Sequence, residues 1–148
     1  MSVLWRAGAR RDLEAVIALI RQDSRGRSGE EAGTERLEAA FHALSGRQDA
    51  HLIVGEIGGE VVATYQLFLI EAVSLSAPLR AQIEDVRVDA GYRGRGIGVA
   101  LMADAEMRAR VAGATLAQLL SNQSRVEAHA FYAARGYVAS HLGFKKRL

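Results

Sequence analysis

The chain has 148 residues, of which 49% are hydrophobic, and a formal net charge of +2 at pH 7. This length and composition predict one domain over residues 1–148 with a substantial core, and the small net charge and scattered arginines argue against nucleic-acid binding. The absence of cysteine excludes a disulfide, a thiolate metal site and a cysteine nucleophile. No apolar run approaches the ~18 residues of a membrane span, and the first residues lack the apolar core of a secretory signal, which favours a cytoplasmic location.

Hydrophobic periodicity predicts the elements of the first third of the chain. Residues 3–7 are expected to form a short strand. Asp12 is placed to cap a helix that runs to about Ser24, because apolar residues recur at helical spacing after it. A second helix is expected over about Glu30–Ser45, where Gly46 fits its end.

The rest of the chain alternates strands and helices. His51–Ile57 and Val61–Ala72 are predicted strands, joined by Gly58-Gly59, a pair that suits a two-residue hairpin turn. The later elements are a strand at Ala81–Asp89, a helix at Gly96–Ala112, a strand at Thr115–Ser121, a helix at Ser124–Arg135 and a last extended segment at Tyr137–Arg147. This order predicts an α/β or α+β layered domain.

A glycine-rich loop is the most informative stretch. Gly94, Gly96 and Gly98 alternate with Arg93, Arg95 and Ile97 between a predicted strand and a predicted helix. Glycine lets the main chain approach a ligand closely, and the first N–H groups of a helix attract anions. The loop therefore predicts a binding site for a phosphate or pyrophosphate, to which the two arginines add positive charge.

Two other phosphate-binding patterns fit this loop poorly. A P-loop requires a lysine, but the only lysines of the chain are Lys145 and Lys146. A dinucleotide fingerprint requires a third glycine where Ala100 and Leu101 stand, and the loop comes too late in the chain for a doubly wound domain.

The loop and a later segment resemble a known family. The pattern Arg93-x-x-Gly96-x-Gly98, the asparagine Asn122 after a strand, and Phe131-Tyr132 followed by Gly136-Tyr137 are similar to the signature of the GNAT superfamily of N-acetyltransferases. The resemblance implies a mixed, splayed β-sheet flanked by about four helices, with acetyl-CoA as co-substrate. It also implies which residues bind that co-substrate: the main chain of Val86 and Val88, the loop residues Arg93, Gly94, Arg95, Gly96, Ile97 and Gly98, and Asn122.

Three residues are candidates for the chemistry of acetyl transfer. By resemblance, the Tyr132 hydroxyl protonates the departing thiolate. Glu84 and Asp85 interrupt an apolar strand, where a buried carboxylate is costly unless it is paired. Strand alternation sends them to opposite faces, so only one is expected in a substrate cleft. The resemblance favours Glu84 as base or ammonium-binding group; a salt bridge with Arg80 or Arg87 is the structural alternative.

The sequence predicts no metal site, because none of the four histidines stands in a ligand pair such as H-x-x-x-H. The expected function is acetylation of a primary amine on a small polar molecule. A peptide or protein amine, a non-catalytic CoA-binding regulatory module and a nucleotide-binding protein remain alternatives. The identity of the acceptor is left open. A homodimer is possible through the last predicted strand, which could equally complete the chain's own sheet.

Overall fold

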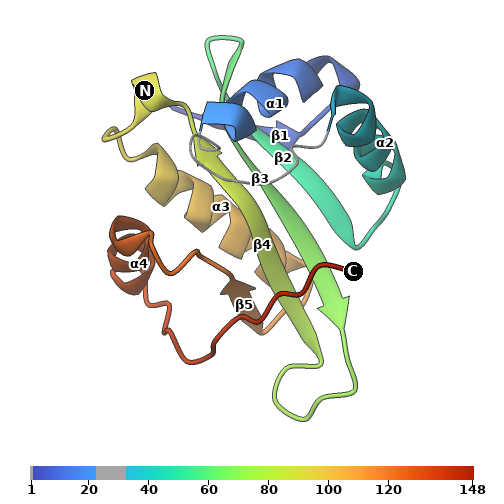
Figure 1. Ribbon diagram of the computed structural model, residues 1–148, viewed down its shortest axis with the longest axis vertical. Helices are drawn as coiled ribbons and strands as arrows, with labels where there is room; N and C mark the ends of the chain where they lie inside the picture. The colour runs from blue at the N-terminus through green and yellow to red at the C-terminus, as the bar shows by residue number, and fades with distance from the viewer. Residues whose placement is uncertain (1, 23–32) are drawn as a thin grey trace.

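The computed structural model describes residues 2–22 and 33–148 (Figure 1). One five-stranded sheet has the order β1-β2-β3-β4-β5, in which the first four strands are antiparallel and β5 is parallel to β4. The strands are β1 (Leu4–Ala7), β2 (Ala50–Ile57), β3 (Glu60–Glu71), β4 (Leu79–Val88) and β5 (Leu116–Leu119). The α-helices of the described residues are α1 (Leu13–Gln22), α2 (Thr34–Leu44), α3 (Ile97–Val111) and α4 (Val126–Ala133). The predicted mixed α/β fold is confirmed.

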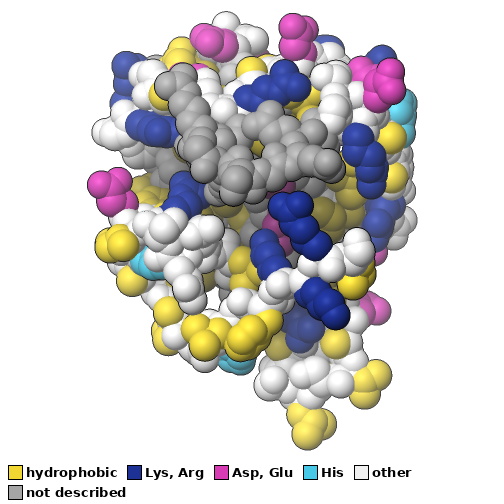
Figure 2. Space-filling model, in the orientation of Figure 1, with side chains coloured by type: hydrophobic (Ala, Val, Ile, Leu, Met, Phe, Trp, Pro, Cys, Tyr) yellow, Lys and Arg dark blue, Asp and Glu magenta, His cyan; other side chains and the backbone are white. Residues whose placement is uncertain are grey.

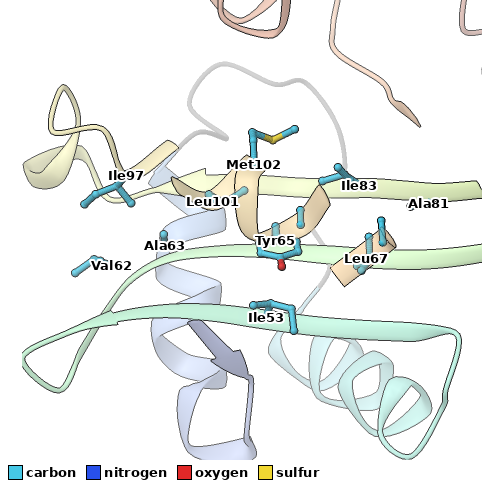
Figure 3. Packing of buried hydrophobic residues seen from close by; sticks show 12 residues of the cluster. Ile53, Val62, Ala63, Tyr65, Leu67, Ala81, Ile83, Ile97, Leu101 and Met102 are labelled. Carbon is cyan, nitrogen blue, oxygen red and sulfur yellow. The ribbon is translucent and has the colours of Figure 1, made fainter. Parts of the chain in front are cut away.

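The core lies between the sheet and α3. Figure 3 shows Tyr65, Leu67 and Ile83 of the strands with Leu101 and Met102 of α3, all of them buried. Alternate residues of the strands and residues at helical spacing in α3 supply these apolar side chains, as binary patterning requires. Helix α1 packs on β3 and β4, and α2 on β2.

The β2–β3 hairpin turns at the predicted glycine pair. Gly58 has φ 60° and Gly59 has φ 88°, a combination that side chains with a Cβ disfavour. The turn therefore fixes which β3 residues face α3. None of the helices in the described residues is long and apolar enough to cross a membrane.

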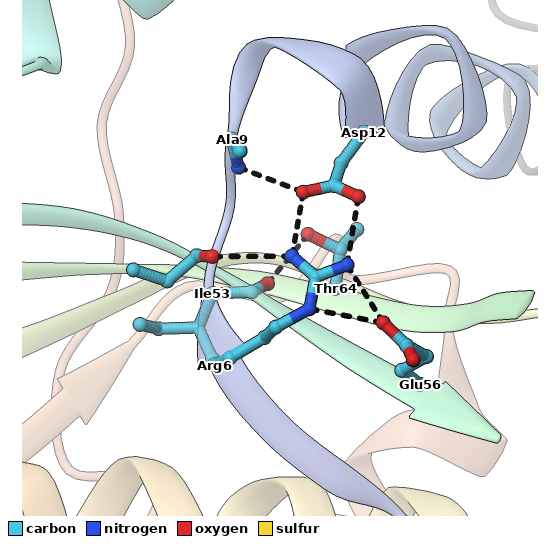
Figure 4. Close-up of polar contacts among 7 residues, drawn as sticks. Arg6, Ala9, Asp12, Ile53, Glu56 and Thr64 are labelled. Carbon is cyan, nitrogen blue, oxygen red and sulfur yellow. Dashed lines mark hydrogen bonds and ion pairs between the residues drawn. The ribbon is translucent and has the colours of Figure 1, made fainter. Parts of the chain in front are cut away.

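A partly buried ionic network ties the start of the chain to the hairpin (Figure 4). Arg6 donates to both carboxylate oxygens of Asp12, at 2.7 and 2.8 Å, and to Glu56 at 2.7 Å. The main-chain N–H of Ala9 also donates to Asp12. Asp12 thus stands before α1 as predicted, but its side chain serves Arg6 and Ala9 instead of the helix amides. The Arg6 hydrogen bond lowers the pKa of the Asp12 carboxyl.

The end of the chain differs from the prediction. Residues after Tyr137 form no strand, so the extended segment Tyr137–Arg147 was predicted wrongly as a strand. The segment would have to pair with β5, which has only four residues. In addition, Gly143 and the charged residues 145–147 interrupt the alternation of apolar residues. The predicted helix end at Ser24 and helix start at Glu30 lie outside the described residues.

We expect Asp12→Asn to destabilise the fold by about 1–3 kcal/mol at neutral pH, because it leaves the Arg6 guanidinium partly uncompensated. The Asp12 pKa is lowered in the folded state, so its contribution is complete above its ordinary value of 3.8. That contribution is lost as the pH falls through the lower folded-state value. Urea unfolding of both proteins from neutral to acid pH checks this. A difference in stability that stays constant below pH 3.8 would contradict the assignment.

Candidate functional site

The sheet opens between β4 and β5. The two strands pair only from Arg80↔Leu116 to Ile83↔Leu119. In the described part of the chain β4 continues to Val88 with no neighbour on that side. This is the splay that the resemblance predicted. Main-chain groups along such an edge can bind an extended ligand in the manner of an added strand.

A β-bulge lies at the start of this open edge. Gln66 of β3 pairs with Glu84, and Thr64 pairs with Arg87, so β4 has one extra residue there. Asp85 has φ 48°, the only positive φ of a non-glycine residue in the described chain. A bulge of this kind redirects side chains and stores strain, which is common at functional sites.

The bulge overturns the prediction that Glu84 and Asp85 lie on opposite faces. Both line one open cavity of about 1010 Å³, together with residues of β3 and the loop before β2. The expected alternation fails because Asp85 leaves the extended conformation. The structure therefore brings the two candidate carboxylates together.

A chain of amides holds Glu84. Gln118 of β5 donates to Gln82 at 2.6 Å, and Gln82 donates to Glu84 at 3.0 Å. Neither glutamine was singled out from the sequence, because their contact depends on the Gln82↔Gln118 register between two strands far apart in the chain. The predicted alternative, an ion pair with Arg80 or Arg87, is replaced here by a neutral donor.

Asp85 has different partners. It accepts from Gln66 at 3.0 Å and from Arg87 at 3.4 Å. Arg87 is 8% exposed and Asp85 is 43% exposed, so the arginine is buried while the carboxylate is open to solvent. Arg87 therefore already offsets the charge of Asp85, whereas Gln82 leaves the charge of Glu84 intact. This difference favours Glu84 over Asp85 as the group that meets an ammonium ion.

Tyr132 lies on α4, packed against the core cluster. The rings of Phe131 and Tyr137 lie at centroid distances of 5.3 and 6.0 Å from its own. Burial raises the pKa of Tyr132, and the positive charges of Arg125 and Arg87 partly oppose this. The hydroxyl is therefore protonated at neutral pH and can donate a proton.

The three loop glycines have different structural roles. Gly94 has φ 74° and Gly96 has φ 78°, and apart from its chain neighbours no described residue lies within 4 Å of a Cβ built at either. That open space is what close approach of a ligand requires. A Cβ at Gly98 would instead lie 3.5 Å from the Phe131 ring, so its small size also serves helix packing. Ile97 is buried, which leaves its main chain, not its side chain, for a ligand.

The arginines of the glycine loop and Asn122, which follows β5, have partners within the protein. Arg93 donates to the carbonyl of Val88 at 3.3 Å, and the Arg95 guanidinium lies 5.2 Å from the centre of the Tyr92 ring. The Asn122 carboxamide oxygen accepts from the main-chain N–H and the hydroxyl of Ser124, in a local turn.

Ser121 is a polar residue that the sequence did not single out. Its hydroxyl oxygen is buried and has no hydrogen-bond partner among the described residues. Such an atom needs a partner, and a bound ligand at the β4–β5 opening would provide one. A serine after a strand carries no signal in sequence. The described residues contain no group of three or more His, Asp or Glu side chains placed to hold a metal ion.

Comparison with known proteins identifies the family. The sequence model of the acetyltransferase (GNAT) family matches residues 13–137, so the chain belongs to this family. A transcriptional regulator from Bacillus halodurans C-125 has a similar structure, with a TM-score of 0.91 and 31% identity over 99% of this chain and 100% of that one. Glucosamine-6-phosphate N-acetyltransferase from Arabidopsis thaliana shares the fold, with a TM-score of 0.80 and 20% identity over 99% of each chain.

A curated relative matches only in part. Aminoalkylphosphonate N-acetyltransferase of Salmonella typhimurium (strain LT2) is 45% identical over 67 residues. The match spans 45% of this chain and 44% of that protein. It supports the family and leaves the substrate of this chain to be established.

We expect Gly96→Val to weaken acetyl-CoA binding by at least about tenfold, or ~1.4 kcal/mol, because a side chain would fill the space over the loop. Gly46→Val is the matched control. Gly46 has φ 81° and an equally open Cβ position, so a valine there causes similar backbone strain. Gly46 lies far from the glycine loop in the sequence. Calorimetric titration with acetyl-CoA measures the effect. Equal affinities in the two folded variants would contradict the loop assignment.

Proposed function

We propose that the protein transfers the acetyl group of acetyl-CoA to a primary amine of a small polar molecule. The amine attacks directly, with both substrates bound together. The observation that carries the proposal is the open edge of β4. It begins at Glu84, which faces a large cavity, and leads to the glycine loop at the start of α3.

The described residues fit acetyl-CoA. Val86 and Val88 would bind its extended pantetheine arm through main-chain groups, as an added strand would bind. The main-chain amides of residues 93–98 would bind the pyrophosphate. Asn122 would contact the pantetheine arm through its amide nitrogen, since its oxygen is used by Ser124. The unpartnered Ser121 hydroxyl supports a polar ligand at the same opening.

Two side chains have the chemistry that acetyl transfer requires. The ammonium form of the acceptor must lose a proton to become a nucleophilic amine, and Glu84, held by Gln82, would accept that proton directly or through water. The departing thiolate gains from a proton donor, and Tyr132, whose pKa burial raises, would supply it. No covalent enzyme intermediate is needed.

The acceptor is proposed to be small and polar. The Salmonella relative is named for aminoalkylphosphonates, so these amines are the first to test. The cavity of Glu84 and Asp85 is also lined by Arg47, but its guanidinium already donates to Asp49 at 2.9 Å, so the carboxylates of the cavity favour the ammonium group of an acceptor. The cavity is wide, and an exposed amine of a peptide is a further possible acceptor class.

A second candidate function is a regulatory module that binds CoA without catalysis. The name of the Bacillus structure, a transcriptional regulator, favours it. Such a module needs the glycine loop but neither Tyr132 nor the amide chain from Gln118 to Glu84. Those side chains therefore distinguish the two functions.

We expect Tyr132→Phe to lower kcat by about 10²–10⁴-fold, the usual contribution of a general acid, while acetyl-CoA affinity is retained. Tyr137→Phe is the matched control, because its ring packs on Tyr132 but its hydroxyl binds Glu106 at 3.3 Å. The rate of thiol release from acetyl-CoA with an acceptor amine gives kcat, and its dependence on acetyl-CoA concentration gives the KM for acetyl-CoA. Equal rates in the two variants would exclude Tyr132 as the acid.

We expect Glu84→Gln to lower kcat/KM for the amine much more than Asp85→Asn, because Arg87 already pairs with Asp85. Each substitution keeps the size of the side chain and removes its charge. Steady-state kinetics with varied amine measure the two effects. A larger loss in Asp85→Asn would reverse the assignment of the two carboxylates.

A further inference from the structure

The only two lysines of the chain, Lys145 and Lys146, stand in the C-terminal segment, residues 138–148. All residues of this segment are exposed, and none belongs to a helix or strand. Phe144 is 92% exposed and Leu142 is 73% exposed. A segment with so few buried contacts can shift locally at little cost in free energy.

This C-terminal segment passes the β4–β5 opening. A Cβ at Gly143 would lie 3.3 Å from a methyl carbon of Leu120. Leu120 follows Leu119, which makes the last pair of β5 with β4, to Ile83, so Leu120 stands at the point where the open edge of β4 begins. Figure 1 shows the segment crossing β5 and β4 towards the C-terminus, and Figure 2 shows Lys and Arg side chains gathered over the same area.

The placement favours Lys145 over Lys146. Lys145 is two residues beyond Gly143, a distance of at most about 7 Å along the chain. Lys146 is one residue farther from that contact.

We propose that Lys145 is itself an acetyl acceptor and that the protein acetylates its own C-terminal segment. The proposal rests on the function proposed above. The Lys145 amine attacks the thioester carbonyl of acetyl-CoA, so an N–C bond forms and the C–S bond breaks. Glu84 accepts the proton of the amine, and the leaving thiolate takes a proton from Tyr132. The products are N-acetyllysine and CoA thiol, and no other reactant is required.

The test is incubation of the protein with acetyl-CoA and no other amine, followed by peptide mass spectrometry. We expect an acetyl group on Lys145, none in Lys145→Arg, and an unchanged yield at Lys145 in the matched control Lys146→Arg. Both variants keep the positive charge of the segment. The rate per molecule should not change when the protein is diluted, because the acceptor belongs to the same chain.

Three results would overturn the proposal. Equal acetylation of both lysines would show that position does not select the acceptor. Undiminished acetylation in Glu84→Gln and Tyr132→Phe would show a purely chemical reaction. A rate per molecule that falls in proportion to dilution would show transfer between molecules. Turnover of a small amine, measured in the same samples, separates the two proposals. If small amines are acetylated and Lys145 is not, only the acetylation of Lys145 is excluded. If neither small amines nor Lys145 are acetylated, the proposed function is excluded as well.

Discussion

The site depends on a mismatch in length between two parallel strands. β4 runs to Val88, but β5 stops pairing with it at Ile83. Beyond that point side chains donate to this edge: Arg87 to the carbonyl of Val86 at 2.8 Å and Arg93 to the carbonyl of Val88 at 3.3 Å. An extended ligand added at this edge would run towards the glycine loop at the start of α3. The proposed binding of an extended co-substrate therefore depends on the topology of the sheet more than on a particular side chain.

The second constraint is the bulge at Asp85. An extra residue in β4 turns two successive carboxylates towards one cavity, which regular alternation forbids. The surroundings then separate their roles: Asp85 is balanced by a buried arginine, and Glu84 is oriented by an amide chain. The strain at Asp85 is tolerated because hydrogen bonds from Gln66 and Arg87 hold it there.

The elements that depend on local pattern were predictable from the sequence. The hairpin glycines, the helix after the glycine loop and the helix that carries Tyr132 follow from turn chemistry and periodicity, and the structure confirms them. The bulge was not predictable, because nothing in Ile83-Glu84-Asp85-Val86 marks an extra residue until β3 sets the register. The contact of Gln82 with Gln118 likewise requires the parallel pairing. The apolar residues of the last segment alone predict a strand, but β5 has only four residues to pair with it.

The central claim is that this opening brings acetyl-CoA and a primary amine together for reaction. The most direct measurement is acetyl-CoA-dependent thiol release across aminoalkylphosphonates, amino sugars, aminoglycosides, polyamines, amino acids and short peptides. The chain has no cysteine, so the protein adds no thiol background. Our account predicts rapid release with one small-amine class. Tight binding of acetyl-CoA without release by any amine would contradict catalysis and leave a regulatory module as the function.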